Sequence, residues 1–380
     1  MSAVEPGAAP HAASLDGPSP ARRRRLSIVE GSARWKLLIG GSIAVAFLLV
    51  AALAWVFPVI EARLVSRFVA LGVALLGLQF VVGRAGQLSL CHGVFVGLGS
   101  YATTISVSRY GFPHLAGLAM APVVGFAFGC LVGLLALRIR ANYLGPVTLS
   151  VAVVFPMFVK RFGWFTGGSS GLPLVREMDA PGLLQLAPGE LYRWNHLVIV
   201  AVAVLALIVM RNVVFSLIGS SVKAVADNAL SAATSGIDVR RTRVLAYAFG
   251  AAFGALGGGL LVLDTPVVGA DSYTLFQSLG YYAAVMVGGA TSMLGAVIGA
   301  LLLVLVPWLM ESQGLRASPP LVLGGLLVLT TLVAPAGVAV AIRNRMSSLV
   351  EVRHPIEEAR RAAGASPSVA HYRAPDEHSR

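Results

Sequence analysis

The charged residues of this chain are so sparse that they leave long stretches free of Asp, Glu, Lys and Arg. An α-helix needs about 20 mostly apolar residues to cross the hydrocarbon core of a bilayer. Nine uncharged stretches reach or approach that length: Leu37–Ile60, Phe68–Gly83, Ala85–Ser108, Tyr110–Leu137, Ala141–Val159, Trp194–Met210, Val244–Leu263, Ser272–Met310 and Ala317–Ile342. Ser272–Met310 is about twice as long as one crossing and accommodates two, with a turn at Gly289–Ser292. The pattern therefore predicts about ten transmembrane helices.

Composition supports this fold class. The chain is 57% hydrophobic and 12% charged, whereas a soluble domain carries about 25% charged residues. We therefore expect an all-α, polytopic transmembrane helix bundle over residues 37–343, with an outer loop at 160–193 and an inner loop at 211–243. Residues 1–36 and 344–380 are polar and lack hydrophobic periodicity, which predicts disordered cytoplasmic tails.

The net charge of +12 indicates orientation rather than nucleic-acid binding, because little chain outside the membrane could hold a nucleic-acid site. If both termini are cytoplasmic and ten crossings alternate, most Lys and Arg residues fall inside, as the positive-inside rule requires. We expect a multi-pass protein of the bacterial inner membrane, with anionic lipid contacting Arg22–Arg25. The apolar stretch that follows exceeds the roughly 7–15 residues of a signal-peptide core, so Leu37–Phe57 is expected to be a retained helix.

The sequence disfavours three functions: nucleotide hydrolysis, proton-coupled transport and serine hydrolysis. A phosphate-cradling loop needs a Gly-Lys pair, and none of Lys36, Lys160 and Lys223 follows a glycine. No Asp, Glu, Lys or Arg lies inside a predicted crossing, which disfavours a proton-coupled carrier. Gly167–Gly171 matches the G-x-S-x-G pattern of serine hydrolases, but it lies outside the strand-to-helix turn that this chemistry requires.

Two features inside the predicted helices suggest how the bundle packs and works. Glycines recur every four residues at Gly125, Gly129 and Gly133, and again at Gly250, Gly254 and Gly258, which predicts close helix packing within the chain or between subunits. The segment Gly86–Gly93 is polar for a crossing. Irregular backbone at membrane depth is tolerated where it is buried in protein or lines a cavity. This segment is therefore the best candidate for a translocation path.

The inner loop contains an alanine-rich segment. The composition predicts a helix over Ser221–Thr234, ended by Gly236. A short amphiphilic helix on the inner face can dock into the groove of a partner. A solvated connector fits the composition equally well.

Four stretches together resemble a known family: Gly86–Gly93 followed by Gly99–Tyr101, Thr166–Leu172, Gly219–Val239 and Val287–Gly299. They are similar to signature segments of the permease subunits of branched-chain amino acid ABC importers, of the M-type (LivM-like) kind. The resemblance covers roughly 75–338. The chain departs from the family pattern at Cys91, Ser220, Ala226, Ala233 and Ala296, which weakens inferences about coupling and substrate.

The resemblance implies a helical permease that pairs with a second, H-type permease. Two cytoplasmic ATPase subunits would hydrolyse ATP, this chain would bind no cofactor, and an extracytoplasmic binding protein would deliver a branched-chain amino acid or a related small polar solute such as urea or an amide. The expected path residues are Gln87, Ser89, His92, Gly93, Tyr101, Thr166, Gly167 and Gly168. The expected ATPase-coupling residues are Lys223, Asp227, Asn228, Ala232, Gly236, Ile237 and Asp238. A stand-alone channel or secondary carrier for a small polar solute remains the alternative.

Overall fold

The computed structural model divides the chain into two units, one formed by Met1–Ile39 with Arg345–Arg380 and the other by Gly40–Asn344. The structure describes residues 28–29, 49–53, 55–138, 143–174, 178, 190–265, 267–314, 319–333, 337–339, 341 and 352–353. In the first unit, strand β1 (Ile28–Val29) pairs in parallel with strand β4 (Val352–Arg353). The other residues of the two predicted tails, and most of Leu37–Phe57, lie outside the described residues.

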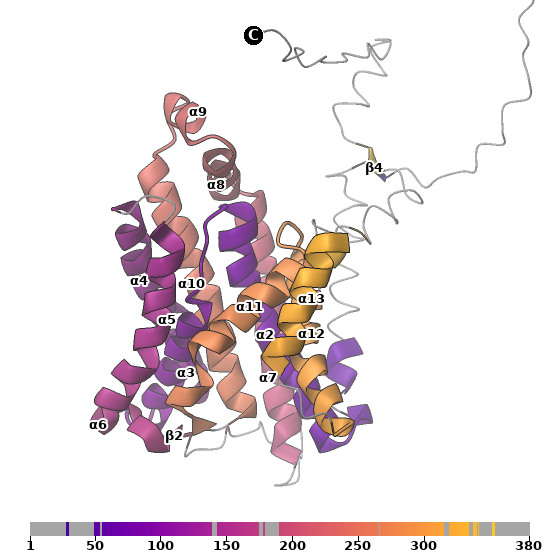
Figure 1. Cartoon of the computed structure of the whole chain (residues 1–380). Coiled ribbons are helices and arrows are strands. Elements are labelled where there is room, and N and C mark those ends of the chain that lie inside the picture. Colours follow the sequence, from indigo (N-terminus) through magenta and orange to yellow (C-terminus); the bar gives the residue numbers. More distant parts are fainter. Residues whose placement is uncertain are drawn as a thin grey trace, which may run out of the picture. The chain divides into compact units, whose positions relative to one another are not determined.

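The larger unit is a bundle of helices (Figure 1). After helical residues 49–53 and 55–56, its helices are α2 (Val59–Gln79), α3 (His92–Ser108), α4 (His114–Leu137), α5 (Leu144–Arg161), α6 (Gly163–Thr166), α7 (Leu191–Phe215), α8 (Leu217–Asp227), α9 (Ala229–Thr234), α10 (Val239–Asp264), α11 (Leu275–Gly288), α12 (Met293–Ser312) and α13 (Pro319–Val333). A π-helical turn over Phe80–Arg84 extends α2. Strands β2 (Leu172–Pro173) and β3 (Val267–Val268) pair antiparallel, and short 3-10 turns cover Gly168–Ser170 and Ala270–Ser272.

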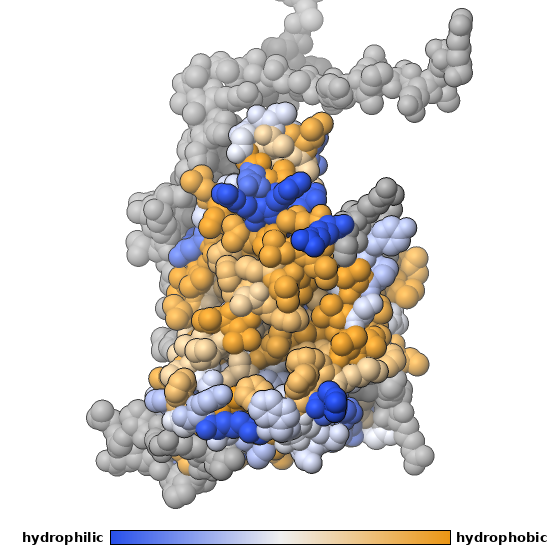
Figure 2. All heavy atoms as spheres, turned by 90° about the vertical axis from the view of Figure 1, so that its left-hand side faces the viewer, coloured by the Kyte–Doolittle hydropathy of each residue, from blue (hydrophilic) through white to orange (hydrophobic). Residues whose placement is uncertain are grey.

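Six helices in the described part of the chain are long and apolar enough to cross a membrane. They are α2 with its π-helical extension, α4, α5, α7, α10 and α12. One face of the molecule shows a broad hydrophobic band with hydrophilic residues at both ends (Figure 2). These features confirm the predicted polytopic, all-α transmembrane bundle.

The helices extend beyond the uncharged stretches that predicted them. Arg211 lies inside α7, and Arg240, Arg241 and Arg243 lie in the first turns of α10. Long arginine side chains at a helix end can keep the guanidinium in water while the apolar stem lies along the helix. A charge therefore marks the level of the membrane boundary and not the end of the helix.

Helix α10 packs against α2, α3 and α4 through glycines. A Cβ at Gly77 of α2 would overlap the backbone oxygen of Gly250, and a Cβ at Gly99 of α3 would overlap the backbone oxygen of Ala255. On α4, Gly129 lies against Ala248 in the same way. Small residues let helix backbones approach closely in lipid, where packing drives association. The predicted glycine spacing is thus used for contacts within the chain.

Two predicted crossings are interrupted helices. In the stretch Ala85–Ser108, residues 85–91 are not helical and α3 has 17 residues. In the first half of Ser272–Met310, α11 has only 14 residues. The predicted turn at Gly289–Ser292 is correct, because α11 ends at Gly288 and α12 begins at Met293. Non-helical backbone is tolerated before α3 because Tyr247 of α10 and Thr148 of α5 form hydrogen bonds with its polar groups.

The prediction of one helix over Ser221–Thr234 was wrong. The segment forms two helices, α8 and α9, that meet at Asn228. The backbone of Asn228 is extended, with φ −156° and ψ 103°. Its side chain accepts hydrogen bonds from the N–H groups of Leu230 and Ser231 at 3.1 and 3.0 Å. An asparagine that caps a new helix competes with continuation of the previous one.

Candidate functional sites

Helices α3 and α11 begin beside each other inside the bundle. The backbone N–H of Gly93, in the first turn of α3, donates a hydrogen bond to the Ser278 hydroxyl of α11 at 3.1 Å. The Nε2 atom of His92 lies 2.8 Å from the carbonyl oxygen of Ala74. Ala74 lies near the middle of the span formed by Val59–Arg84. This junction of α3 and α11 therefore lies well away from both ends of the bundle.

The extended segment before α3 is held by side chains from α5 and α10. Tyr247 donates its hydroxyl to the carbonyl oxygen of Leu88 at 2.6 Å, and the N–H of Leu90 donates to the hydroxyl of Thr148 at 3.2 Å. The predicted path residue Gln87 donates from Nε2 to the carbonyl oxygen of Arg243 at 3.4 Å. Backbone groups of a non-helical segment at membrane depth need such partners, because lipid offers none.

The predicted path residues Ser89 and His92 are both buried. Ser89 is 1% exposed, and its hydroxyl lies 3.9 Å from the sulfur of Cys91. His92 has no exposed surface. Its ring packs edge-on against Phe95, with 5.8 Å between ring centroids. In this conformation the imidazole holds α3 against α2, and a solute would reach it only after the helices separate.

Tyr101 links the junction to the opposite end of α3. Its ring lies edge-on to Tyr273 and Phe155, with centroid distances of 6.3 and 6.5 Å. Its hydroxyl donates to the carbonyl oxygen of Val268 at 3.5 Å, and Val268 pairs with Leu172 in the β2–β3 ladder. No sequence pattern singles out Tyr273, Ser278 or Tyr247, because their roles depend on tertiary contacts.

The remaining predicted path residues form a turn after α5. Thr166 donates its hydroxyl to the carbonyl oxygen of Val159 at 2.7 Å and accepts from the N–H of Gly168 at 3.3 Å. Gly167 and Gly168 have φ angles of 83° and 60°, a region where L residues with side chains are rare. This turn lies at the β2 end of the bundle in Figure 1, opposite α8 and α9. The structure thus separates the path candidates into the junction and this end turn.

The α8–α9 segment forms a structured projection. Lys223 and Asp227 are paired on the surface of α8. Helix α9 ends in a Schellman motif, in which the N–H groups of Gly236 and Ile237 donate to the carbonyl oxygens of Ala233 and Ala232, both at 3.0 Å. The φ angle of Gly236 is 82°, so the predicted helix stop is confirmed.

Within this projection the predicted coupling residues have different environments. Ala232 is buried at 4% exposure, whereas Lys223, Asp227 and Asn228 are exposed. Asp238 caps α10 by accepting from the N–H of Arg241 at 3.0 Å. These residues shape and attach the projection, which lies at one extreme of the bundle in Figure 1.

The most exposed apolar side chains of the projection were missed by the sequence analysis. Leu230 at the start of α9 is 77% exposed, and Leu217 at the start of α8 is 86% exposed. In a capped, well-formed turn, an exposed leucine is available to a partner. The available signal was a leucine among the small residues that follow Asn228.

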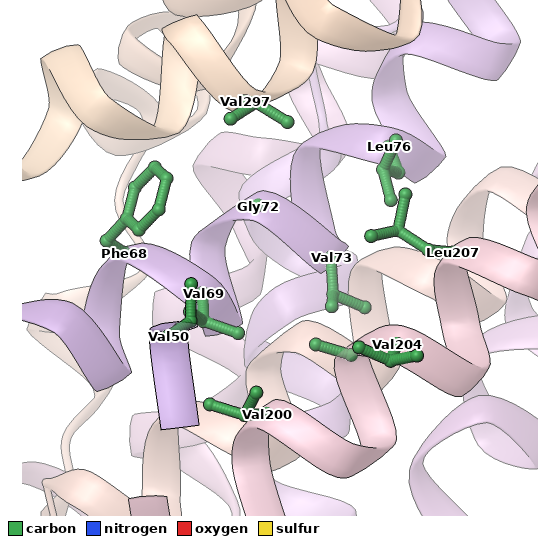
Figure 3. A pocket seen from close by; sticks show the side chains of 11 residues that line it. Val50, Phe68, Val69, Gly72, Val73, Leu76, Val200, Val204, Leu207 and Val297 are labelled. Atoms are coloured by element: carbon green, nitrogen blue, oxygen red, sulfur yellow. The ribbon is translucent and has the colours of Figure 1, made fainter. Parts of the chain in front are cut away.

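A cavity of about 250 Å³ lies between α2, α7 and α12 (Figure 3). The side chains that surround it are apolar: Val50, Phe68, Val69, Val73, Leu76, Val200, Ala203, Val204, Leu207 and Val297, with Gly72 beside them. A polar solute would lose its hydration there without gaining a hydrogen-bond partner. This cavity is therefore a poor route for amino acids or amides.

Comparison with known proteins identifies the family. Residues 60–334 match the family described as the branched-chain amino acid transport system permease component. The high-affinity branched-chain amino acid transport system permease protein LivM of Escherichia coli K12 is 29% identical over 314 residues, which cover 76% of this chain and 73% of that protein. LivM of Salmonella typhimurium is 28% identical with the same coverage.

A second kind of relative also matches. The permease protein LivH of Escherichia coli K12 is 26% identical over 281 residues, which cover 69% of this chain and 89% of LivH. Matches to both kinds imply a pair of permease subunits within an ABC transporter. No solved structure matches the chain significantly. The chain belongs to the branched-chain amino acid transport permease family and is a LivM-like, multi-pass permease subunit of an importer.

Proposed function

We propose that this chain is the M-type half of an ATP-driven importer for branched-chain amino acids or a related small polar solute such as urea or an amide. It would pair with an H-type permease in the bacterial inner membrane, with both termini in the cytoplasm. Two ATPase subunits would bind its inner face, and an extracytoplasmic binding protein would bind its outer face. The chain itself would bind no cofactor, because ATP would be hydrolysed by its partners.

The observation that carries this proposal is the α8–α9 projection. Helix α9, capped by Asn228, presents the exposed side chain of Leu230 at the end of the bundle where Lys223, Arg240 and Arg241 also lie. Basic residues favour the cytoplasmic side. A short helix with an exposed apolar residue suits the groove of a partner protein. We therefore assign α8–α9 to contact with the ATPase subunits.

The junction of α3 and α11 supports a path for a polar solute. Both helices begin there, and a helix N-terminus presents N–H groups and a partial positive charge. Transporters with interrupted helices use such termini to bind anionic groups of the substrate near the membrane midplane. We assign the substrate path to this junction and to Gln87, and we expect the bundle to alternate between inward-open and outward-open states with different solute affinities.

The outer end turn is assigned to the binding protein. Thr166, Gly167 and Gly168 lie at the end opposite the projection, close to the ion pair between Lys160 and Asp271, whose Nζ and Oδ1 atoms are 2.7 Å apart. A charged and hydrogen-bonded rim of this kind is typical of a wet, transient protein interface.

Purification of the co-expressed transporter tests the proposal. The tagged chain is isolated in mild detergent with the products of its neighbouring genes, and the co-purifying proteins are identified and quantified. We expect an ATPase subunit and an H-type permease, together with ATP-dependent uptake in proteoliposomes. Leu230→Asp should reduce ATPase recovery at least tenfold, whereas Gln313→Asp, at the other end of the bundle, should leave it unchanged.

Two outcomes would overturn the assignment. Recovery of this chain alone, under conditions where a known ABC complex stays intact, would favour the stand-alone channel or carrier. Recovery of the ATPase with both variants would retain the importer but remove α8–α9 as the docking segment.

A further inference from the structure

A cavity lies where the C-terminal end of α4 meets the N-terminal end of α10, at the end of the bundle that we assign to the cytoplasm. Leucines and two arginines line it. Its volume is about 520 Å³. The residues that surround it are Leu131, Leu134, Leu135, Leu137, Arg138 and Arg240. It is thus apolar along α4 and cationic at its end, unlike the wholly apolar cavity between α2, α7 and α12.

The packing of α4 on α10 explains why the two arginines meet. The helices run antiparallel, and a Cβ at Gly129 would meet Ala248, while a Cβ at Gly133 would meet Val244. Four residues further toward this end of the bundle, Leu137 on α4 lies level with Arg240 on α10. Residues four apart lie on one face of a helix. The glycine contact therefore sets the two guanidinium groups at one end of a shared groove.

No acidic side chain of the described residues is paired with either arginine. The two acidic residues of the adjacent projection are engaged elsewhere, since Asp227 pairs with Lys223 and Asp238 pairs with Arg241. Arg138 and Arg240 are both exposed. Two neighbouring guanidinium groups without an acidic partner favour an external anion, most strongly one that they bind with charge-assisted hydrogen bonds.

The apolar part of the cavity faces outward from the bundle. Leu131 and Leu134 are 59% and 55% exposed. Figure 2 shows this side of the molecule, with a hydrophilic patch directly above the hydrophobic band on the same side as the projection. In a membrane, the leucines lie at the depth of acyl chains and the arginines at the depth of the headgroups.

We propose that Arg138, Arg240 and the leucines of α4 form a binding site for one anionic diacyl phospholipid. The guanidinium groups bind the headgroup phosphate, and one acyl chain lies along Leu131 and Leu134. Basic pockets between transmembrane helices on the cytoplasmic side are suited to anionic lipids. A free phosphate would leave the leucines unused, whereas a zwitterionic lipid brings an ammonium group close to the arginines.

The affinity for lipid can be measured by native mass spectrometry. The full chain, co-purified with its partner subunits and then delipidated, is titrated with dioleoylphosphatidylglycerol, with dioleoylphosphatidylcholine and with inorganic phosphate. We expect a saturable phosphatidylglycerol site and much weaker retention of the other two. Each arginine near an anionic surface contributes about fivefold, so Arg138→Gln with Arg240→Gln should weaken phosphatidylglycerol binding about thirtyfold.

Arg241→Gln is the matched control. Arg241 is one residue along α10, its side chain is 85% exposed, and it pairs with Asp238. It should change phosphatidylglycerol affinity less than about fivefold, the contribution of one arginine. Weakening by Arg241→Gln as large as that by Arg240→Gln alone would show a diffuse charge effect and overturn the site. Binding of phosphate as tight as the lipid would overturn the acyl-chain contact, and unchanged lipid binding with loss of the ATPase subunit would identify the arginines as a protein interface.

Discussion

The hydroxyl of Ser278 accepts a hydrogen bond from the backbone N–H of Gly93 at 3.1 Å and so joins the first turns of α3 and α11. Both residues are buried. The bond therefore satisfies a helix-terminal donor that neither lipid nor water reaches in this conformation. It also connects the two interrupted helices at the place where we assign the substrate path.

Loss of the Ser278 hydroxyl should destabilise the bundle. Ser278→Ala leaves the N–H of Gly93 without its acceptor, which should lower the free energy of unfolding by about 1–3 kcal/mol. Thermal or SDS-induced unfolding of the purified chain in detergent measures this loss. Ser150→Ala is the control, because the Ser150 hydroxyl is exposed and bonds only to its own helix, at the carbonyl oxygen of Pro146. Equal stability of both variants would contradict a structural role for the Ser278 bond.

The glycine contact between α3 and α10 should be intolerant of a single methyl group. Gly99→Ala places a Cβ on the backbone of Ala255, so the helices must separate, at a cost of about 1–3 kcal/mol. Gly324→Ala on α13 meets no atom of the described residues within 4 Å and should be neutral or stabilising by about 1 kcal/mol, because alanine favours helix. The same unfolding assay compares the two. A Gly99→Ala protein as stable as the Gly324→Ala protein would show that the contact is loose.

In the turn after α9, the effect of substituting Gly236 should depend only on whether the new residue tolerates a positive φ angle. Gly236 has a φ of 82°, and a Cβ added there would meet no atom of the described residues within 4 Å, so space does not limit substitution. Asparagine tolerates this conformation and a β-branched residue does not. Gly236→Val should lower ATP-driven uptake and increase hydrogen exchange in α9, whereas Gly236→Asn should preserve both. Similar uptake in the two variants would separate the turn from coupling.

His92 should act on helix position rather than on solute affinity. His92→Leu keeps a buried side chain but removes the bond to the Ala74 carbonyl, which should cost about 1 kcal/mol of stability. Uptake should fall in maximum rate while the half-saturation concentration stays unchanged. A raised half-saturation concentration at unchanged stability would place the imidazole in contact with the solute.

The positions of the long helices could be predicted because burying a charge in lipid is costly. The uncharged stretch Tyr110–Leu137 became α4, which starts at His114. The polarity of Gly86–Gly93 singled out the segment that is non-helical up to Cys91, where the backbone needs protein partners. Those partners could not be predicted: Ser278 is 185 residues from Gly93, and Tyr247 is 159 residues from Leu88.

Local capping explains the main error in the inner loop. The alanine content of Ser221–Thr234 favours one helix, but the side chain of Asn228 binds two backbone N–H groups and starts a second. Helix propensity differences are less than about 1 kcal/mol per residue, and a good cap contributes a similar amount. A single asparagine can therefore outweigh several alanines.

Helix α10 gives the transporter a lever. Its 26 residues form a rod of about 39 Å, and its glycine contacts with α2, α3 and α4 lie along its length and act as a fulcrum. The rod is joined at one end to the projection through the Asp238 cap. A tilt of about 5° around the middle of this rod would move each end by roughly 2 Å. A small displacement on one side of the membrane would then be converted into an opening on the other.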